Sequence, residues 1–394
     1  MKEICKQKFC TGCGACYAIC PVSAINFVDS GFRGVFPSID QSICIDCGRC
    51  IQVCPTHVPA LKKSPEKAYA AYGRSISERA SSASGGIASV LAENIVVNGG
   101  AVYGCVQESA AVICHKRIDT VEDLQALKGS KYVHSQCNDA YKSVRSDLDE
   151  GLRVMFVGTP CQVAGLNNYL GGKSEGLLTV DLCCHGVPSQ SLLKSHLSDL
   201  GLVPEDCLVN FRRKDRGKIE YGLGVSSSTD ADSCWTPAYS DSYMTGFLSG
   251  MFFRENCFGC QYAERERCSD ITLADYWGYK EGKDPQMTDR MGLSAVLINT
   301  ESGMKAFESI MDKVCYEQCT VDETIRSNEQ FRQPSVKPET YDAFMATCEQ
   351  SGYSAACRKF MPGLKMTLWL RQIKSRYYAW PLRQYLRKKF KRIS

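Results

Sequence analysis

The sequence of 394 residues lacks any apolar run long enough to cross a membrane. Its first ten residues, MKEICKQKFC, also lack the apolar centre of a signal peptide, so we expect a cytoplasmic protein. The Gly-x-Gly-x-x-Gly fingerprint of dinucleotide-binding turns is absent, so spacing alone predicts no mode of dinucleotide binding. Apart from one duplicated cysteine run, no unit of roughly 20 to 50 residues recurs, which excludes a solenoid.

Acidic residues are absent from the end of the chain. From Gln350 onward there is no Asp or Glu, whereas Arg358 to Ser394 contain twelve Lys and Arg. Because the formal net charge of the whole chain is +4, the rest of the chain is net acidic. The expected tail, residues 346–394, is also rich in aromatic residues. We expect it either to dock on the acidic body or to bind anionic lipids at the inner face of the membrane; nucleic acid is the least favoured partner.

Cysteine, by contrast, is abundant, with 24 in the chain. Residues 10–55 contain two runs, C-TG-C-GA-C-YAI-C-P and C-ID-C-GR-C-IQV-C-P, which match the C-x2-C-x2-C-x3-C-P pattern of two-cluster bacterial ferredoxins. Zinc sites normally use two close cysteine pairs, and disulfide frameworks belong to secreted proteins, so both alternatives are disfavoured. The pattern predicts two 4Fe-4S clusters and therefore electron transfer.

Each run supplies three ligands to one cluster and a fourth, one helical turn further on, to the other cluster. Glycines between the ligands let the backbone approach the cluster closely. The predicted ligands of the first cluster are Cys10, Cys13, Cys16 and Cys54. The predicted ligands of the second cluster are Cys44, Cys47, Cys50 and Cys20.

We expect a ferredoxin unit over residues 1–62 and, after a linker at residues 62–65, an oxidoreductase domain over residues 67–345. Early in the second domain, Ser-Gly-Gly precedes a helix predicted over residues 87–97, with Ser84 as its N-cap. Unpaired N–H groups at such a helix start can bind a phosphate. A capped helix after a flexible loop is the more common meaning of this pattern.

Two strand-turn-helix units follow each other in residues 153–200. Consecutive units of this kind have parallel strands, so both turns lie at the carboxyl edge of the sheet, where open α/β sheets bind ligands. Each turn contains a cysteine, Cys161 and Cys184, although free cysteines are more often small buried apolar residues. The expected fold class is α+β or α/β: a bacterial-ferredoxin-like domain, a mixed α/β domain and a basic tail.

A series of short motifs in the second domain resembles a known family. In order they are Ser-Gly-Gly at 84–86, Gly-Ser-Lys-Tyr at 129–132, Val-Gly-Thr-Pro-Cys-Gln at 157–162, Asp-x-x-Cys-His-Gly at 181–186, Cys-x-x-Cys at 257–260 and Ser-Asp-Ile-Thr-x-x-Asp-x-Trp-Gly at 269–278. From about residue 67 to residue 300 the chain resembles the coenzyme F-420 (deazaflavin) hydrogenase/dehydrogenase beta-subunit family, in the bacterial form with a fused N-terminal two-cluster ferredoxin domain. The resemblance implies a flavin-binding domain with bound FAD and an iron–sulfur centre.

The resemblance also implies roles for individual residues. A third 4Fe-4S cluster is implied on Cys161, Cys184, Cys257 and Cys260. Cys183 and Cys268 are neighbours that could substitute. Lys131 is expected beside the flavin ring or a phosphate, and His185 as a proton relay; a solvated lysine and a histidine that only orients its loop are the alternatives. Trp277 is expected in the core. The other implied cofactor-binding residues are Ser84, Gly85, Gly86, Gly158, Thr159 and Asp275.

These expectations combine into an iron–sulfur flavoprotein oxidoreductase. Electrons from a redox partner protein or a small donor would enter the N-terminal clusters, and FAD would reduce a small organic acceptor, because flavin converts between one- and two-electron transfer. The alternative is a non-catalytic electron-transfer subunit that delivers electrons to a partner enzyme. A body of more than about 200 residues is large for a mere electron carrier, which favours the enzyme.

Overall fold

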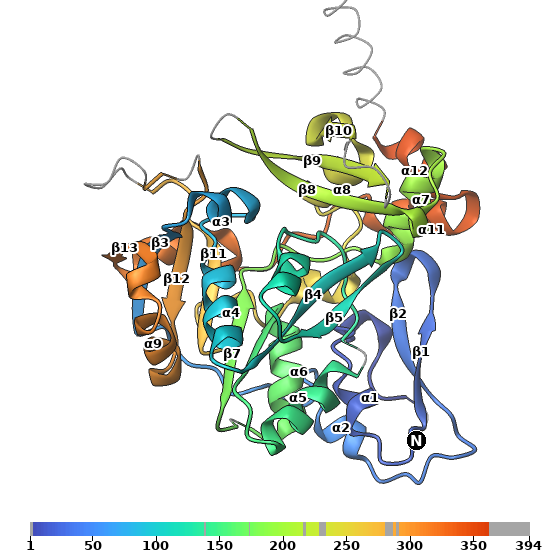
Figure 1. The fold of residues 1–394 in the computed structure, drawn as a ribbon. Helices are drawn as coiled ribbons and strands as arrows, with labels where there is room; N and C mark the ends of the chain where they lie inside the picture. Colours follow the sequence, from blue (N-terminus) through green and yellow to red (C-terminus); the bar gives the residue numbers. More distant parts are fainter. Residues whose placement is uncertain are drawn as a thin grey trace, which may run out of the picture.

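The computed structural model describes residues 3–361, except 138, 173, 216–217, 228–233, 280–286 and 289–290. The basic segment 364–394, on which the docking and membrane expectations rest, lies outside the described residues. Figure 1 shows the N-terminal unit, in blue, on one side of a larger body. Among the helices that are described, none combines the length and the apolar character that a membrane span requires.

The N-terminal unit repeats one local structure at its two cysteine runs. In each run a glycine in the left-handed region, Gly14 at φ 88° and Gly48 at φ 73°, precedes a short helix. Glycine adopts this conformation without the steric cost of a Cβ. The helices are α1 (Ala15–Ile19) and α2 (Arg49–Gln52); between them lie the hairpin strands β1 (Ile25–Asp29) and β2 (Val35–Ile39), and the 3-10 helices of the unit are η1 (Gln7–Phe9) and η2 (Gly31–Arg33).

The body is built on an eight-stranded mixed sheet. Its strands are β3 (Lys67–Gly73), β4 (Ala101–Ser109), β5 (Val112–Ile118), β6 (Val154–Gly158), β7 (Leu177–Leu182), β11 (Ile271–Asp275), β12 (Ser294–Ile298) and β13 (Val314–Cys319). Their order is β13-β3-β12-β11-β7-β6-β4-β5, and the central four, β11, β7, β6 and β4, are parallel. The outer pairs are antiparallel. The predicted parallel pairing of the two strand-turn-helix units and the mixed α/β fold class are confirmed.

Helices cover both faces of this sheet, because its strands alternate apolar side chains between the two faces. Met155 of β6 packs in one core with α4 (Ile87–Val97) and α9 (Glu301–Glu308). Its neighbours Val154 and Phe156 pack in another core with α5 (Ala140–Asp149) and α6 (Pro160–Leu170). That second core also contains residues of α1, so the N-terminal unit packs on the α5–α6 face. The remaining elements near the sheet are α3 (Ile76–Ser81), η3 (Glu122–Leu127), η8 (Met311–Lys313), α10 (Val321–Arg326) and η9 (Glu329–Phe331).

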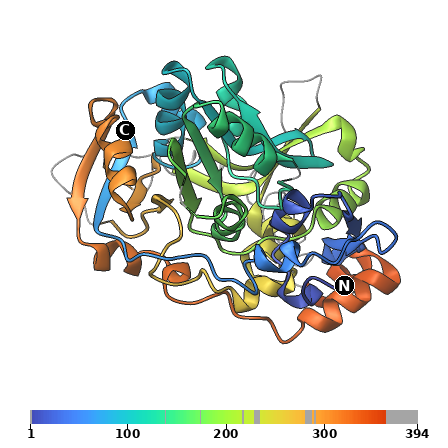
Figure 2. The ribbon, with the colours of Figure 1, turned by 90° about the horizontal axis from the view of Figure 1, so that it is seen from below.

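A second, three-stranded antiparallel sheet lies beside the first (Figure 1). It consists of β8 (Cys207–Asp215), β9 (Lys218–Ser227) and β10 (Cys234–Pro237), with the helices α7 (Gln190–Asp199), η4 (Pro204–Asp206), η5 (Ala238–Ser240), α8 (Ser242–Leu248), η6 (Glu255–Gly259), α11 (Tyr341–Ser351) and α12 (Tyr353–Phe360). Phe211, Tyr243 and Phe344 belong to its buried core. The expected start of the tail at residue 346 falls inside α11. Figure 2 shows α11 and α12, in red-orange, beside the N-terminal unit, where Arg33 Nε donates to Glu349 Oε1 at 2.6 Å.

Two sequence predictions of local structure are wrong. The N-cap of α4 is Gly86, in the left-handed region at φ 85°, whereas Ser84 Oγ donates to the carbonyl of Leu293 at 3.1 Å. The helix expected over residues 240–256 ends at Leu248. Gly250 adopts φ 68°, and its N–H and that of the next residue bond back to the last turn of α8, which is the Schellman way of ending a helix.

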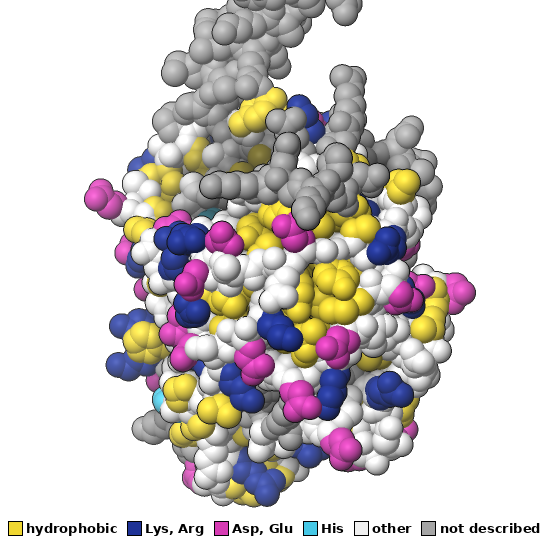
Figure 3. Space-filling model, turned by 90° about the vertical axis from the view of Figure 1, so that its left-hand side faces the viewer, with side chains coloured by type: hydrophobic (Ala, Val, Ile, Leu, Met, Phe, Trp, Pro, Cys, Tyr) yellow, Lys and Arg dark blue, Asp and Glu magenta, His cyan; other side chains and the backbone are white. Residues whose placement is uncertain are grey.

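The face beside β13 and α9 is shown in Figure 3. On the part of this face that is drawn in colour, Lys and Arg side chains alternate with Asp and Glu, and apolar side chains lie between them. Surface charges of both signs at close spacing produce no extended single-sign field. This face therefore does not favour a polyanionic partner.

Candidate functional site

The first predicted cluster site is a small cavity in the N-terminal unit. Its lining includes all four predicted ligands, Cys10, Cys13, Cys16 and Cys54, and one further thiol, Cys5. A hydrogen bond from Cys5 lowers the pKa of the Cys10 thiol to about 7, and another lowers that of Cys54 to about 6. Both therefore favour the thiolate, which is the form that binds iron. Sequence reasoning missed Cys5, because it lies outside the repeated spacing.

The second predicted site is more open. Cys20, Cys47 and Cys50 lie near one another: the pKa of Cys50 is raised first by burial and further by the charges of Cys47 and Cys20. The Cys44 thiol lies 4.0 Å from Asp46 Oδ1, within the loop of the second run. Cys47 is exposed, whereas all four predicted ligands of the first site are buried. Ligation of clusters by these two sets of cysteines stays a prediction.

A third group of thiols lies at the carboxyl edge of the central sheet. Its members, Cys161, Cys184, Cys257 and Cys260, line one large pocket. Thr159 forms a capping box with Gln162 at the start of α6, which places Cys161 in the first helical turn. Cys184 follows β7, and η6 brings the Cys-x-x-Cys pair to the same place. The fold thus joins two pairs that are far apart in the sequence.

The chemistry of this third group fits an iron–sulfur cluster. Burial raises the pKa of Cys161, and repulsion from Cys260, Cys184 and Cys257 raises it further. Burial also raises the pKa of Cys257 to about 12. Bound iron would offset the cost of gathering four thiolates, since a metal ion stabilises the deprotonated thiol. In the described part of the chain, no three His, Cys, Asp or Glu side chains are grouped around a single-ion site, but a cubic cluster binds each cysteine through a different iron atom.

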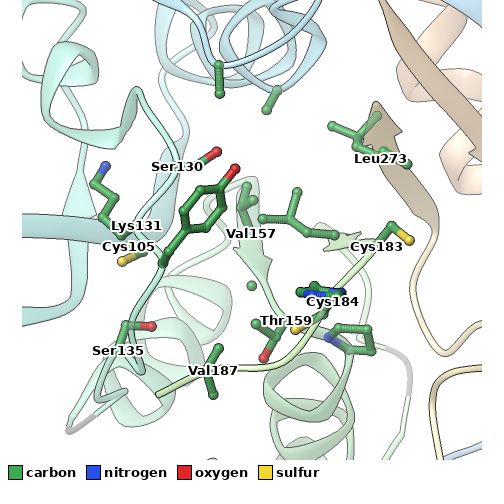
Figure 4. A pocket seen from close by; sticks show the side chains of 18 of the residues that line it. Cys105, Ser130, Lys131, Ser135, Val157, Thr159, Cys183, Cys184, Val187 and Leu273 are labelled. Atoms are coloured by element: carbon green, nitrogen blue, oxygen red, sulfur yellow. The ribbon is translucent and has the colours of Figure 1, made fainter. Parts of the chain in front are cut away.

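The two neighbouring cysteines, Cys183 and Cys268, have other surroundings. Figure 4 shows Cys184 beside Thr159 and Cys183 on the opposite side of the loop, toward Leu273. The Cys183 N–H donates to the carbonyl of Leu273 at 2.8 Å. The Cys268 thiol is buried and donates to the carbonyl of Pro160 at 3.3 Å. Neither therefore replaces a member of the Cys161 group.

The large pocket has a volume of about 600 Å³, within the usual range for a small-molecule site. Its wall consists of the start of α4, the loop 128–135, the strand ends and turns at 157–162 and 182–187, and the end of β11. In Figure 4, Lys131 and Cys105 lie on one side of this space and Leu273 on the other. The parallel strands thus open into the pocket at their carboxyl ends, as expected for an α/β sheet.

The start of α4 lies at this pocket, but the three residues of the Ser-Gly-Gly motif differ. Ser84 and Gly86 belong to the lining, together with the first residues of α4. Gly85 N–H donates instead to Ser294 Oγ at 3.1 Å, so that N–H is not free to hold a phosphate. Gly85 must be small, because an added Cβ would lie 2.4 Å from the carbonyl oxygen of Ala71. Its presence in the motif follows from packing between β3 and β12.

The two residues predicted to be catalytic, Lys131 and His185, line the pocket on different walls. Lys131 Nζ donates to the carbonyls of Ala126 and Lys128 at 3.0 and 2.8 Å, and burial lowers its pKa. His185 lies between the edges of two phenylalanine rings, with Nδ1 3.1 Å from Gln330 Nε2. Burial lowers its pKa as well. Gly158 and Thr159 also belong to the lining.

Asp275 lies in the lining as part of an ion pair that the sequence did not reveal. Arg212 Nη1 lies 2.8 Å from Asp275 Oδ2, and the same guanidinium donates to Tyr132 and lies 4.8 Å from the Tyr221 ring centroid. No local motif marks Arg212, because it lies on a strand of the second sheet. Trp277 is 40% exposed and lines the pocket, so its expected place in the core is wrong. The fold ends β11 at Asp275, which leaves Trp277 on the following turn.

The doubled cysteine unit on a mixed α/β body defines an iron–sulfur electron-transfer protein of the oxidoreductase class. Residues 151–324 match the family described as the C terminus of the coenzyme F420 hydrogenase/dehydrogenase beta subunit, and residues 9–58 and 36–98 match 4Fe-4S dicluster domains. The chain therefore belongs to the coenzyme F420 hydrogenase/dehydrogenase beta-subunit family, with an N-terminal 4Fe-4S dicluster domain. The family resemblance and the two N-terminal 4Fe-4S clusters expected from the sequence are confirmed at this level.

A solved structure of the F420-reducing [NiFe] hydrogenase complex from Methanosarcina barkeri contains a similar chain. The two share 17% sequence identity, with a TM-score of 0.44, over 75% of this chain and 91% of that chain. Among curated proteins, none matches the chain.

Proposed function

We propose that this protein is an iron–sulfur flavoprotein reductase that takes single electrons at its ferredoxin unit and reduces an organic acceptor at the large pocket. The observation that carries the proposal is that one pocket is lined both by the Cys161 group and by Ser84, Lys131 and Asp275. Thiols suited to an iron–sulfur cluster thus adjoin a cavity large enough for a small molecule.

The packing of the N-terminal unit supports a continuous path between iron–sulfur sites. Gly165 of α6 lies against the first cysteine loop, and an added Cβ there would lie 2.8 Å from Cys13 Sγ. The same helix begins with Cys161 in its first turn. One helix therefore contacts the first site and contributes a thiol to the third site.

The pocket residues fit FAD as the bound group. The start of α4 presents backbone N–H groups and the positive end of a helix, which suits a pyrophosphate, with Ser84 and Gly86 beside it. Lys131 would place a positive charge near the ring or a phosphate, and Tyr132 and Trp277 offer aromatic faces. A flavin bound here would supply exchange between one-electron and two-electron transfer. His185, held by Gln330, would give or take a proton at the acceptor.

Cofactor content of protein purified without oxygen tests this proposal. We expect about twelve iron atoms and about twelve sulfides per chain, since each 4Fe-4S cluster contains four of each, together with one flavin. Lys131→Met should keep the iron and weaken flavin retention by roughly 10-fold or more, the size of one lost charged hydrogen bond. Lys116→Met, on an exposed strand position paired with Glu108, is the matched control. Zinc in place of iron, or no flavin, would contradict the proposal.

A second candidate, an electron-transfer subunit of a larger enzyme, is favoured by the family description, which names a beta subunit. Activity distinguishes the two. A reductase should, on its own, oxidise a chemical reductant with a small organic acceptor in steady turnover. A subunit should be reduced once, fail to turn over, and regain activity only with its partner enzyme.

A further inference from the structure

Arg254 connects the first and third thiol sites. It is the N-cap residue of η6, the segment that contains Cys257, and it is 3% exposed. Its carbonyl accepts the Cys257 N–H at 2.9 Å, and its own N–H donates to the carbonyl of Val187 at 2.8 Å. The side chain runs the other way, where Nη2 donates to the carbonyl of Cys10 at 3.1 Å. The backbone thus holds one site and the guanidinium contacts the other.

The N-terminal unit is shaped around this guanidinium. Nη1 donates to the carbonyl of Val35 at 3.2 Å, and the Phe36 ring centroid lies 4.7 Å from Cζ. A Cβ added at Gly34 would lie 2.5 Å from Nη1, and one added at Gly12 would lie 3.2 Å from Nη2. Both glycines also adopt positive φ, at 99° and 68°. Residues with side chains at these positions would collide with Arg254.

The charge of Arg254 has no carboxylate partner among the described residues. Another buried arginine, Arg267, shows the usual arrangement, with Nη2 3.0 Å from Asp181 Oδ2. Arg254 bonds to backbone carbonyls alone, and its Nε has no hydrogen-bond partner in the described structure. Burying an ion without a counterion is costly. A 4Fe-4S cluster with four thiolates is a net anion, so a cluster on either side would offset that cost.

The pKa directions agree with this geometry. After the hydrogen bond from Cys5, the charge of Arg254 also lowers the pKa of Cys10. At Cys257, where burial dominates and raises the pKa, the charge of Arg254 acts in the lowering direction. The same cation therefore favours negative charge at both sites, which lie on opposite sides of it.

We propose that Arg254 is a positioning residue shared by two iron–sulfur clusters: its buried positive charge raises the reduction potentials of both and joins them as consecutive electron carriers. The proposal rests on the proposed function, since it requires the third cluster. In the step concerned, one electron leaves the cluster on Cys10 and enters the cluster on Cys257. The first cluster is oxidised by one electron and the second is reduced by one, and no proton is transferred.

Potentiometric titration of the full-length protein, followed by EPR, tests the proposal. Arg254→Gln keeps amide donors for the carbonyls but removes the charge, and Arg254→Lys keeps the charge. We expect Arg254→Gln to contain the same iron as the unaltered protein and to show lower midpoint potentials for the first and third clusters. The second cluster should keep its potential. Arg254→Lys should recover most of both shifts, and Arg213→Met, whose exposed side chain pairs with Glu220, should change none.

Unchanged potentials in Arg254→Gln, or an equal fall in all three clusters, would overturn the inference. A measurement on the unaltered protein does not depend on the folding of any variant: when the protein is fully reduced, the spins of adjacent clusters broaden each other's EPR signals. Absence of this broadening between the first and third clusters would also overturn it. An iron content of about eight per chain would instead show that the third cluster is missing, and the proposed function would fail with it.

Discussion

The two cysteine runs of the N-terminal unit have the same spacing and nearly the same backbone, but they lie in different surroundings. The first run is buried against α6, and its thiols Cys10, Cys13 and Cys16 are all buried. The second run lies at the surface, where Cys47 is exposed and Ile45 is 61% exposed. Local sequence therefore produces two similar iron-binding loops, and packing makes one an inner site next to the body and the other an outer site open to an electron donor.

Removal of one ligand from each run should show the largest difference. Cys13→Ala should lose the inner cluster, about four iron atoms, and block reduction of the pocket by an external donor, because the path to the third site is cut. Cys47→Ala should lose the outer cluster but keep the fold and the inner EPR signal. Iron analysis, EPR and anaerobic thermal unfolding measure both variants. Equal loss of stability in the two would contradict the distinction between inner and outer sites.

Chelation under mild oxidation should separate the two sites in time. The outer cluster should release about four iron atoms first, because solvent reaches Cys47, and the inner cluster should follow in a much slower phase. Iron release followed by absorbance of a chelator complex gives the rates, and EPR of samples taken between the phases identifies the remaining cluster. Release in one phase would show that the two sites are equally accessible.

Gly165→Ala tests the contact between the inner site and α6. The new Cβ would lie 2.8 Å from Cys13 Sγ and 3.0 Å from Tyr141 Oη, so we expect a loss of about 1–3 kcal/mol from overpacking. Gly259→Ala is the matched control, since a Cβ added there would have no other atom within 4 Å and its φ is not positive. Denaturant unfolding under anaerobic conditions measures both changes. A Gly165 variant as stable as the control would mean that α6 yields to the cysteine loop.

Ile45→Ser should have the smallest effect, within about 0.5 kcal/mol, because the side chain is exposed in the outer loop. Ile25→Ala is its counterpart on the buried side of the unit, where the side chain is 3% exposed, and it should cost about 2–5 kcal/mol. Thermal unfolding of the two variants gives the comparison. If Ile45→Ser also slows reduction by a donor protein without changing stability, then the outer loop is part of the docking surface.

Local sequence predicted much of the fold correctly. The helix at 87–97 and the parallel β6 and β7 follow from apolar periodicity and turn residues, which act over a few positions. The failures occur where distant contacts outweigh local pattern. Ser84 has the residue type of an N-cap, but its hydroxyl bonds to the strand carbonyl of Leu293. Trp277 follows a buried strand, but that strand ends early enough to leave the indole at the pocket.

The spacing of the cysteines alone predicted the dicluster domain, because three ligands within seven residues form one loop whatever surrounds it. The meeting of Cys161 and Cys184 with Cys257 and Cys260, the Arg212–Asp275 pair, and the position of Arg254 between two thiol sites were decided by tertiary structure alone. Charges and thiols on different elements come within reach only after the sheet and its helices have packed. No pattern along the chain records those distances.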